Sequence, residues 1–369
     1  MAATESPPHT STPPAHRNVQ NVVLGSLLFR TWYKSIYPEE LVHKDTERLY
    51  VCRWCFRYAC DADAHVKHTR VCDSRTVPSG VKVYDCQGYA VWEIDGAEHT
   101  LFSQNLSLFA KLFVDHKSVF FDVSSFLYYI LTFTDPEDPE SYYILGYFSK
   151  EKLSWDANNL ACILIFPPYQ HKQLGKLLMS VSYKLSGWER EGGFIGGPER
   201  PLSEMGRRSY SRFWAERIAR HFLVGSGSRD EEGTERLSLS PAQKKKSTPN
   251  GTTRKRPHHH QECMTVQEIG QATGMLVEDV ITTLKDMGVV EPDKARKKRN
   301  LGPSSSATPA STEDSRSVVI RKTKVLDWAT SRRVSLQDPV RNEGFIGGWL
   351  RESSAEVQSI EDGESSDSS

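Results

Sequence analysis

Three cysteines and one histidine lie near the N-terminus in a spacing that suits a metal ion. In YVCRWCFRYACDADAHVKHTRVC the pattern is Cys-x2-Cys-x12-His-x3-Cys, formed by Cys52, Cys55, His68 and Cys72. Thiolates and an imidazole at this spacing can hold Zn²⁺ tetrahedrally, between a knuckle and the last turns of a short helix that carries both His68 and Cys72. Four protein ligands leave no open position, so we expect a structural zinc that contributes on the order of 10 kcal/mol to folding.

Two other interpretations of this segment stay open. His65 is a competing ligand and Cys60 is left over, so the thiols could instead be free cysteines in a core. The segment could also be a DNA-reading finger. Against this, residues Phe56 to Val71 carry only three fixed positive charges, and no second finger follows to extend a groove contact.

A second stretch, CILIFPPYQHKQLGK, is typical of a strand, a turn and the start of a helix. The apolar run Cys162 to Phe166 predicts a buried strand, which two prolines end. The helical pattern that follows Gly175 predicts a helix that stops near Gly187. The N–H groups of such a turn and helix start could bind a phosphate, or the stretch could be an ordinary strand–helix connection.

A third stretch, GGFIGGPERPLSEMGRRSYSRFW, places a carboxylate in a rigid turn. Glu199 lies between two prolines, and Ser203 is a suitable N-cap for a helix whose apolar face carries Tyr210, Phe213 and Trp214. Held in this way, Glu199 could act as a positioned base. It could equally be a solvated loop residue.

The segment MTVQEIGQATGMLVEDVITTLKDMGVVE predicts a helix-turn-helix. Thr265 and Glu268 form a capping box, Gly274 breaks the pattern, and a second helix follows. The second helix is expected to expose mainly acidic residues, which favours a structural helix pair over a DNA-reading one; the expected exposed positions are Glu278, Asp279, Thr282, Thr283, Lys285 and Asp286.

The composition of the chain restricts its class and indicates its domain boundaries. The chain has 369 residues with 47 basic and 47 acidic side chains, so net charge favours no class of partner. No apolar run is long enough for a membrane span, the first residues lack the apolar core of a signal peptide, and seven cysteines do not form a secreted disulfide framework. We expect these domains: 1–20, disordered; 21–100, a lobe with the finger 52–72; 101–224, the core; 225–261, a disordered basic insertion; 262–350, a helical lobe with a linker at 292–316; 351–369, an acidic disordered tail.

Taken together, residues 21–350 resemble the MYST family of histone lysine acetyltransferases. The resemblance rests on TWYKSIYPEE, the zinc knuckle, QNLSLFAKLFVDHKSVFFDVSSFLYYIL, LGYFSKEK, NLACILIFPPYQHKQLGKLLMSVSYKLS and PERPLSEMG. The closing KVLDWATSRRVSLQDPV looks most like the fungal silencing-type subgroup. The resemblance implies an α+β fold, in which a GNAT-like acetyltransferase core lies between an N-terminal zinc-finger lobe and a C-terminal helix-turn-helix lobe.

The resemblance also implies the cofactor, acetyl-coenzyme A, and the residues that bind it. The family holds the pyrophosphate on the backbone N–H groups of the turn. Carried over to this chain, the binding residues are Cys162, Ile163, Leu164, Ile165, Phe166, His171, Lys172, Gln173, Leu174, Gly175, Lys176, Leu177 and Ser203. This chain departs from the family pattern at Gln173, where the family has glycine; a left-handed backbone there costs a non-glycine residue about 1 kcal/mol or more.

Acetyl transfer to a lysine needs the neutral amine. With a pKa near 10.4, only about one lysine in 2,500 is neutral at pH 7, a cost of roughly 4.6 kcal/mol that a general base removes. Glu199 matches the family's catalytic glutamate, and burial is expected to raise its pKa. Cys162 matches the family cysteine near the thioester, where it could carry the acetyl group or only shape the site; its apolar strand favours direct attack by the amine. Lys111 matches the position that the family autoacetylates, or it is a lysine that snorkels from an apolar segment.

The function implied is a histone lysine N-acetyltransferase that acts in chromatin silencing or transcription regulation. The implied partners are histone tails, nucleosomes and subunits of a chromatin-silencing complex, with no membrane, and the implied location is the nucleus. A catalytically weak acetyltransferase-fold scaffold, for which Gln173 is the argument, and a DNA-binding chromatin protein are the alternatives. Basic runs at 244–246, 254–256 and 296–299 are either import signals or solvated charge.

Overall fold

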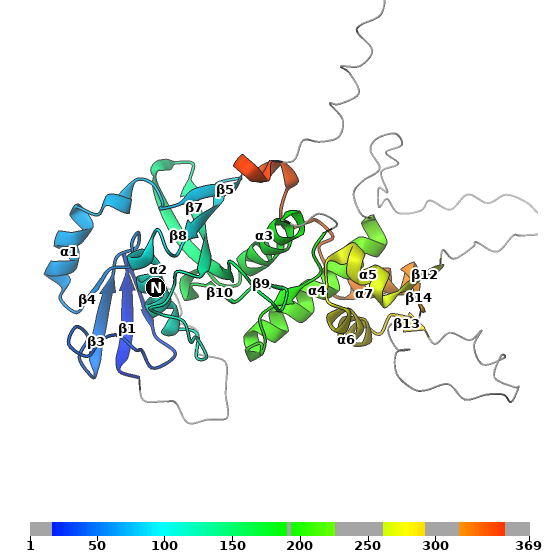
Figure 1. Ribbon diagram of the computed structural model, residues 1–369, viewed down its shortest axis with the longest axis horizontal. Coiled ribbons are helices and arrows are strands. Elements are labelled where there is room, and N and C mark those ends of the chain that lie inside the picture. Colours follow the sequence, from blue (N-terminus) through cyan, green and yellow to red (C-terminus); the bar gives the residue numbers. More distant parts are fainter. Residues whose placement is uncertain (1–16, 190–192, 226–260, 292–316, 351–369) are drawn as a thin grey trace, which may run out of the picture. The chain divides into compact units, whose positions relative to one another are not determined.

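The computed structural model describes residues 17–189, 193–225, 261–291 and 317–350 (Figure 1). Contacts divide the chain into two compact units: residues 1–210 with 338–369, and residues 211–337. The mixed α+β architecture with an N-terminal zinc-finger region confirms the expected fold class. The expected disordered insertion, linker and acidic tail lie almost entirely outside the described residues, as do the three basic runs.

A small mixed sheet forms the zinc-finger part of the first unit. Its strand order is β2-β1-β3-β4, with β1 at Val19–Leu24, β2 at Leu27–Arg30, β3 at Thr46–Val51 and β4 at Tyr58–Ala59. Val19 and Val22 are fully buried, so ordered structure begins before residue 20, where the sequence predicts a disordered segment. The reason is that β1 pairs with both β2 and β3, and this pairing buries one of its faces.

Five antiparallel strands form the main sheet of the first unit. Their order is β10-β8-β7-β6-β5, with β5 at Val81–Cys86, β6 at Tyr89–Asp95, β7 at Phe126–Asp135, β8 at Asp138–Glu151 and β10 at Cys162–Ile165. The predicted strand at Cys162 is therefore present, but it is an edge strand and not a fully buried one. Leu164 is buried and its two neighbours are half-buried, because among the described strands β10 pairs with β8 alone. Gly146 permits this pairing, since a Cβ there would lie 2.4 Å from the Leu164 carbonyl oxygen.

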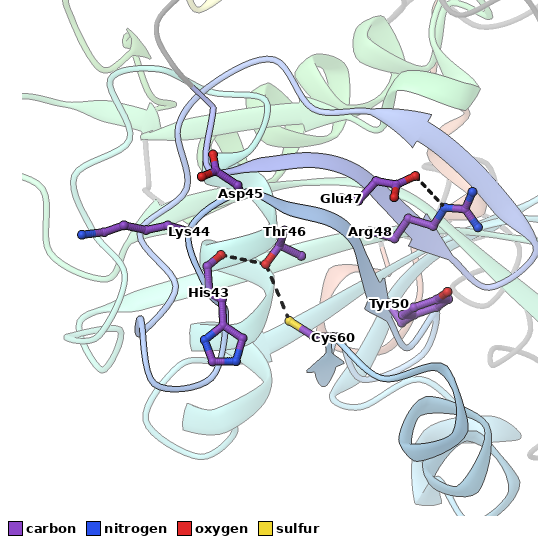
Figure 2. A pocket seen from close by; sticks show the side chains of 8 residues that line it. All are labelled: His43, Lys44, Asp45, Thr46, Glu47, Arg48, Tyr50 and Cys60. Atoms are coloured by element: carbon purple, nitrogen blue, oxygen red, sulfur yellow. Dashed lines mark hydrogen bonds and ion pairs between the residues drawn. The ribbon is translucent and has the colours of Figure 1, made fainter.

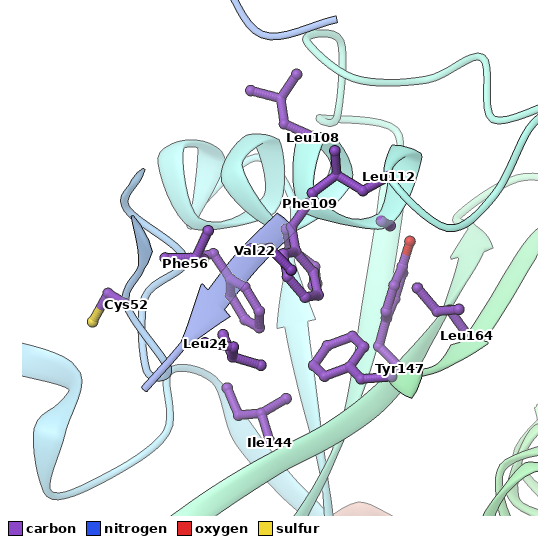
Figure 3. Close-up of a cluster of buried hydrophobic side chains, with 14 of the residues drawn as sticks. Val22, Leu24, Cys52, Phe56, Leu108, Phe109, Leu112, Ile144, Tyr147 and Leu164 are labelled. Carbon is purple, nitrogen blue, oxygen red and sulfur yellow. The ribbon is translucent and has the colours of Figure 1, made fainter. Parts of the chain in front are cut away.

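The core of this unit lies where α2 (Thr100–Lys111) packs against both sheets (Figure 3). Three buried phenylalanines from distant parts of the chain meet there: Phe56 of the knuckle, Phe109 of α2 and Phe166 just after β10. Their ring centroids are 4.9 to 5.8 Å apart, within the range of favourable aromatic contacts. This cluster joins the zinc-finger sheet to the strand that the sequence assigns to the cofactor.

Shorter elements complete the first unit. Helix α1 spans Ala62–Arg70 and α3 spans Leu174–Trp188; α3 continues through Gly187, which was expected to end it. Strand β9 (Asn158–Leu160) pairs in parallel with β11 (Gly197–Pro198). The chain then returns at 342–349, where the fully buried Phe345 packs against Tyr84 of β5 and Trp188 of α3.

Helix α4 (Glu204–Val224) starts in the first unit and ends in the second, and it buries Tyr210, Phe213 and Trp214 as expected. In the second unit, β12 (Gln261–Thr265), β14 (Ser317–Arg321) and β13 (Val290–Glu291) form a sheet in that order. Its first strand starts at Gln261, the residue at which the predicted insertion was to end. Helices α5 (Val266–Thr273), α6 (Val277–Met287) and α7 (Lys322–Ser331) accompany the sheet.

The predicted helix pair is α5 and α6. The Thr265–Glu268 capping box is formed on both sides, and Gly274 ends α5 with a φ of 69°. Two of the residues expected on the exposed face of α6, Asp279 and Thr283, are instead buried. The apolar positions alone therefore misplaced the edge of the buried face, because these polar side chains share the covered side of the helix with Val280 and Leu284.

The aromatic cluster leads to a stability prediction. Phe109→Ala should lower the free energy of unfolding by about 3–5 kcal/mol, since it removes a fully buried ring that contacts two others. Leu101→Ala in the same helix is the matched control, because that side chain is 70% exposed. Urea unfolding measures both, and equal midpoints for the two variants would contradict the proposed importance of the cluster.

Candidate active site and metal centre

The zinc-ligand segment folds as a knuckle followed by a short helix. The Cys52 N–H donates to the Arg57 carbonyl (2.8 Å), and the Phe56 N–H donates to the Cys52 carbonyl (3.0 Å), with Phe56 in a left-handed conformation. Asp61 caps α1, which carries His68 in its last turn. Cys72 lies beyond the helix, after Val71, so the prediction that His68 and Cys72 share a helix face is wrong. The chain turns at Val71 and brings Cys72 back by a different route.

The four predicted ligands nevertheless converge. Their ligand atoms all lie within 4.8 Å of one another. The Cys52 and Cys72 sulfurs are 3.8 Å apart, and the Cys55 sulfur is 3.2 Å from His68 Nε2. A tetrahedral zinc with ordinary bond lengths separates its ligand atoms by about 3.6–3.8 Å. The residues present therefore fit a structural zinc ion.

The remaining candidate ligands lie outside this group. The His65 ring packs on Tyr50, 5.8 Å between centroids. The Cys60 sulfur is 3.4 Å from the Leu41 carbonyl oxygen and 3.9 Å from Thr46 Oγ1. Cys60 lies beside an open pocket of about 560 Å³ next to β3, shown in Figure 2. None of the predicted site residues lines this pocket, so its size does not make it the candidate active site; its lining residues are His43, Lys44, Asp45, Thr46, Glu47, Arg48, Tyr50 and Cys60.

The turn between β10 and α3 has the backbone that the sequence argument requires. His171 and Gln173 both have a φ of 63°, and Gln173 is the N-cap of α3. His171, Lys172 and Gln173 are exposed, while Leu174 is buried and anchors the helix start. The first N–H groups of a helix have no partner within it, and left-handed residues turn successive N–H groups towards one side. The turn can therefore hold an anion such as a pyrophosphate.

The pairing of β9 with β11 places the Glu199 backbone next to the start of β10. Its N–H donates to the Leu160 carbonyl oxygen (2.8 Å), two residues before Cys162. The side chain is exposed, so the expectation that Glu199 is buried is wrong. Its pKa is still raised, as expected, first through partial desolvation and then through the nearby Glu151 carboxylate; Lys117 opposes this rise, and Asp156 adds a smaller contribution to it.

Cys162 has a partner that the sequence argument did not find. Its sulfur is 3.5 Å from the hydroxyl of the fully buried Tyr147, whose ring stacks on Tyr128. The Tyr128 hydroxyl is in turn 3.1 Å from Ser107 Oγ. Burial raises the pKa of Tyr147 well above its ordinary value and that of Tyr128 to about 12, so both are neutral phenols at pH 7. The register that places Tyr147 diagonally across from Cys162 follows from strand pairing, which spacing alone does not reveal.

Two predicted site residues are already engaged within the protein. Ser203 caps α4: its Oγ accepts a hydrogen bond from the Gly206 N–H (3.1 Å), which leaves the hydroxyl proton able to bind a ligand. Lys111 at the end of α2 is mostly buried, donates a hydrogen bond to the Asp115 carbonyl and lies 3.7 Å from the Asp115 carboxylate.

Comparison with known proteins places these features in a family. Residues 77–246 match the model of the MOZ/SAS family, and residues 16–72 match the MYST family zinc finger domain. The chain is 36% identical over 273 residues to histone acetyltransferase MOF of Drosophila melanogaster, which covers 74% of the chain and 28% of that protein. It is 35% identical over 271 residues to the histone acetyltransferase Tip60 homolog of Caenorhabditis elegans. This match covers 73% of the chain and 51% of that protein.

A third relative matches a shorter part of the chain at slightly higher identity. The chain is 39% identical over 218 residues to histone acetyltransferase ESA1 of Gibberella zeae, covering 59% of the chain and 41% of the relative. The chain thus spans from about a quarter to about half of the length of these relatives. No helix within the described ranges is long and apolar enough to cross a membrane.

The metal centre leads to a prediction. Cys55→Ser should lose the zinc and lower the melting temperature by about 20 °C or more, because the binding free energy of a structural zinc, on the order of 10 kcal/mol, is free energy of folding. Cys60→Ser is the matched control, since its sulfur lies outside the cluster and should leave the zinc content unchanged. Elemental analysis and thermal melts measure both. Full zinc retention by Cys55→Ser would remove Cys55 from the ligand set.

Proposed function

The chain belongs to the MYST family of histone acetyltransferases, and from this premise we propose that it transfers the acetyl group of acetyl-coenzyme A to lysine side chains of histone tails. The observation that carries the proposal is the position of Glu199. A carboxylate with a raised pKa is tied by its backbone to Leu160 at the end of β9, two residues before the start of β10, the strand that leads into the turn proposed to bind an anion. Acyl donor and proton acceptor would thus meet at one end of β10.

Binding of acetyl-coenzyme A is assigned to the segment from Cys162 to Leu177, with Ser203. The unpaired side of the edge strand β10 can receive the pantetheine arm, which carries amide groups that suit strand-like hydrogen bonding. The left-handed residues and the first turn of α3 would hold the pyrophosphate. The coenzyme supplies an activated thioester, and the protein supplies its orientation.

Glu199 is proposed as the general base. A raised pKa brings a carboxylate closer to the working pH, where it is still ionised and is a better proton acceptor. Its exposure is compatible with this role, because the substrate lysine must reach it from solvent. As pH falls through this raised pKa, Glu199 becomes protonated and the transfer rate should fall with it.

Cys162 is proposed to shape the site while the amine attacks the thioester directly. The neutral Tyr147 phenol beside the sulfur offers no base to form a thiolate. It instead fixes the position of the cysteine side chain. An acetyl-cysteine route remains the contrary mechanism, and the variants below separate the two.

Finer assignments are also part of the proposal. We place the chain in the fungal silencing-type subgroup on its closing segment KVLDWATSRRVSLQDPV, and infer a nuclear role in silencing or transcription regulation with nucleosomes and subunits of a silencing complex as partners. Lys111 is proposed as an autoacetylated lysine. Acetylation would remove the charge that now contacts Asp115.

A catalytically weak scaffold is the second candidate function. The left-handed backbone at Gln173 favours it, because that conformation costs a glutamine about 1 kcal/mol or more. The Glu199→Gln variant tests the proposed enzyme, and the Gln173→Gly variant tests whether Gln173 weakens coenzyme binding as the scaffold candidate requires.

The base assignment predicts that Glu199→Gln lowers the transfer rate by about two orders of magnitude at pH 7, since the amide keeps the shape and cannot accept the proton. The deficit should shrink as pH approaches the lysine pKa of about 10.4, where the amine is neutral without help. Steady-state kinetics on a histone-tail peptide across pH measures this.

Cys162→Ala is the companion variant. It should cost less and leave the pH profile similar, because no acyl group passes through the sulfur in direct attack. Parent-like activity of Glu199→Gln at pH 7 would remove the assignment. An essential Cys162 with a trapped acetyl group would establish the covalent route.

The turn predicts that Gln173→Gly tightens acetyl-coenzyme A binding by about fivefold, or about 1 kcal/mol, because a residue without a side chain lets the backbone N–H groups approach the pyrophosphate more closely. Lys172→Gly is the control, because Lys172 is not in the left-handed region and glycine there only adds freedom to the turn. Calorimetry gives both affinities. Weaker binding by Gln173→Gly would mean that the glutamine side chain makes its own contact with the coenzyme.

A further inference from the structure

The loop between β8 and β9 carries the most exposed apolar side chains among the described residues. Trp155 is 100% exposed and Leu153 is 87% exposed, two residues apart. A tryptophan left entirely in water is unusual, because this side chain is highly buried on average and is enriched among the residues that dominate interfaces. Nothing in the described fold requires an apolar residue at either position.

The loop backbone is nevertheless held at both ends. At its start, the Lys152 N–H donates to the Ser125 carbonyl (2.9 Å), and the Lys152 ammonium bonds the Asp95 carboxylate (2.7 Å). At its end, the Asn158 N–H donates to Ser154 Oγ (3.3 Å), and the Gly197 N–H donates to the Ala157 carbonyl (3.4 Å). A surface presented by a fixed backbone loses little entropy when a partner binds.

The loop lies beside Glu199. The Gly197 bond joins its last residue to the strand that leads into Glu199, and the carboxylates of Glu151 and Asp156 are near enough to raise the Glu199 pKa. Neither Glu151 nor Asp156 forms an ion pair with any residue that the structure describes.

The charge around this loop is therefore negative. The neighbouring cations Lys150 and Lys152 are neutralised by Glu189 and Asp95. Lys117 offsets part of the negative charge at Glu199, and Arg200 is the next residue along the chain. Three carboxylates next to two exposed apolar side chains fit a partner that is basic and carries an apolar residue.

We propose that the loop Lys152–Ala157 is the docking surface for the substrate segment next to the acceptor lysine, and that it selects a basic peptide with an apolar side chain near that lysine. Trp155 and Leu153 receive the apolar residue, and Glu151 and Asp156 attract the flanking basic residues. This inference rests on the proposed function, because it takes Glu199 as the point where the acceptor lysine is deprotonated. An acidic or a neutral partner would leave the carboxylates unmatched.

The test uses the full zinc-loaded chain and three synthetic peptides with one acceptor lysine. The first has arginine and leucine flanks, the second replaces leucine by serine, and the third replaces arginine by glutamate. Calorimetry gives peptide affinity without acetyl transfer, and kinetics with acetyl-coenzyme A gives kcat and KM. Trp155→Ala, Leu153→Ser and Asp156→Asn are compared with Leu101→Ala, an exposed apolar residue of α2.

Trp155→Ala should weaken binding of the first peptide and raise its KM by about tenfold, as is typical of a tryptophan at the centre of an interface, with kcat changed far less. The serine peptide should be insensitive to Trp155→Ala. Asp156→Asn should reduce the preference for arginine over glutamate flanks. Leu101→Ala should match the parent throughout, as should the affinity of every variant for acetyl-coenzyme A.

The contrary outcomes are distinct. Equal peptide affinities for Trp155→Ala and Leu101→Ala, no binding by the parent, or the same loss with all three peptides would each overturn the docking surface. If Trp155→Ala and Leu101→Ala bind the peptide equally well and acetyl transfer is intact, the docking surface is wrong but the proposed function stands. Weaker peptide binding by Trp155→Ala in a protein that transfers no acetyl group would support the docking surface and count against the proposed activity.

Discussion

The contact of Phe56, Phe109 and Phe166 is the constraint on which the rest of the active region depends. Phe56 belongs to the zinc knuckle, and its left-handed backbone follows from the turn that brings Cys52 and Cys55 together. Phe166 ends β10, and Phe109 holds both rings from α2. A zinc ion on the four ligands would therefore do more than fold a small lobe. By fixing the knuckle it would also fix one wall against which β10 packs, because close-packed cores transmit small displacements.

A second constraint fixes the position of Glu199, the proposed base. Glu199 sits in no helix or strand of its own, and its position comes from two parallel pairs between β9 and β11 with the Glu199–Leu160 hydrogen bond. Gly196 makes the approach possible, since a Cβ there would lie 2.3 Å from the Ala157 carbonyl oxygen. The same approach draws the Lys152–Ala157 loop towards Glu199. The positions of the proposed base and of the proposed substrate surface thus both result from one backbone contact.

Local patterns predicted much of this from the sequence. The zinc ligands, the capping box at Thr265 and the N-cap at Ser203 depend on residues a few positions apart, and each is present. Features that depend on distant pairing were missed or misjudged. The exposed edge of β10, the Tyr147–Cys162 contact and the buried Asp279 are set by which strand or helix lies opposite, and periodicity within one segment carries no information on that. Cys72 was misplaced for a related reason, since a spacing of four also suits a turn that follows a helix.

The most direct measurement of the central claim is a mass balance on one reaction. The zinc-loaded chain is mixed with acetyl-coenzyme A and a histone-tail peptide, and intact-mass spectrometry follows the peptide, the coenzyme and the protein. The account predicts one acetyl-lysine on the peptide for each free coenzyme A released, with Cys162 unmodified throughout. A folded, zinc-loaded chain that releases no coenzyme A and leaves the peptide unchanged would contradict the account and identify the protein as a scaffold.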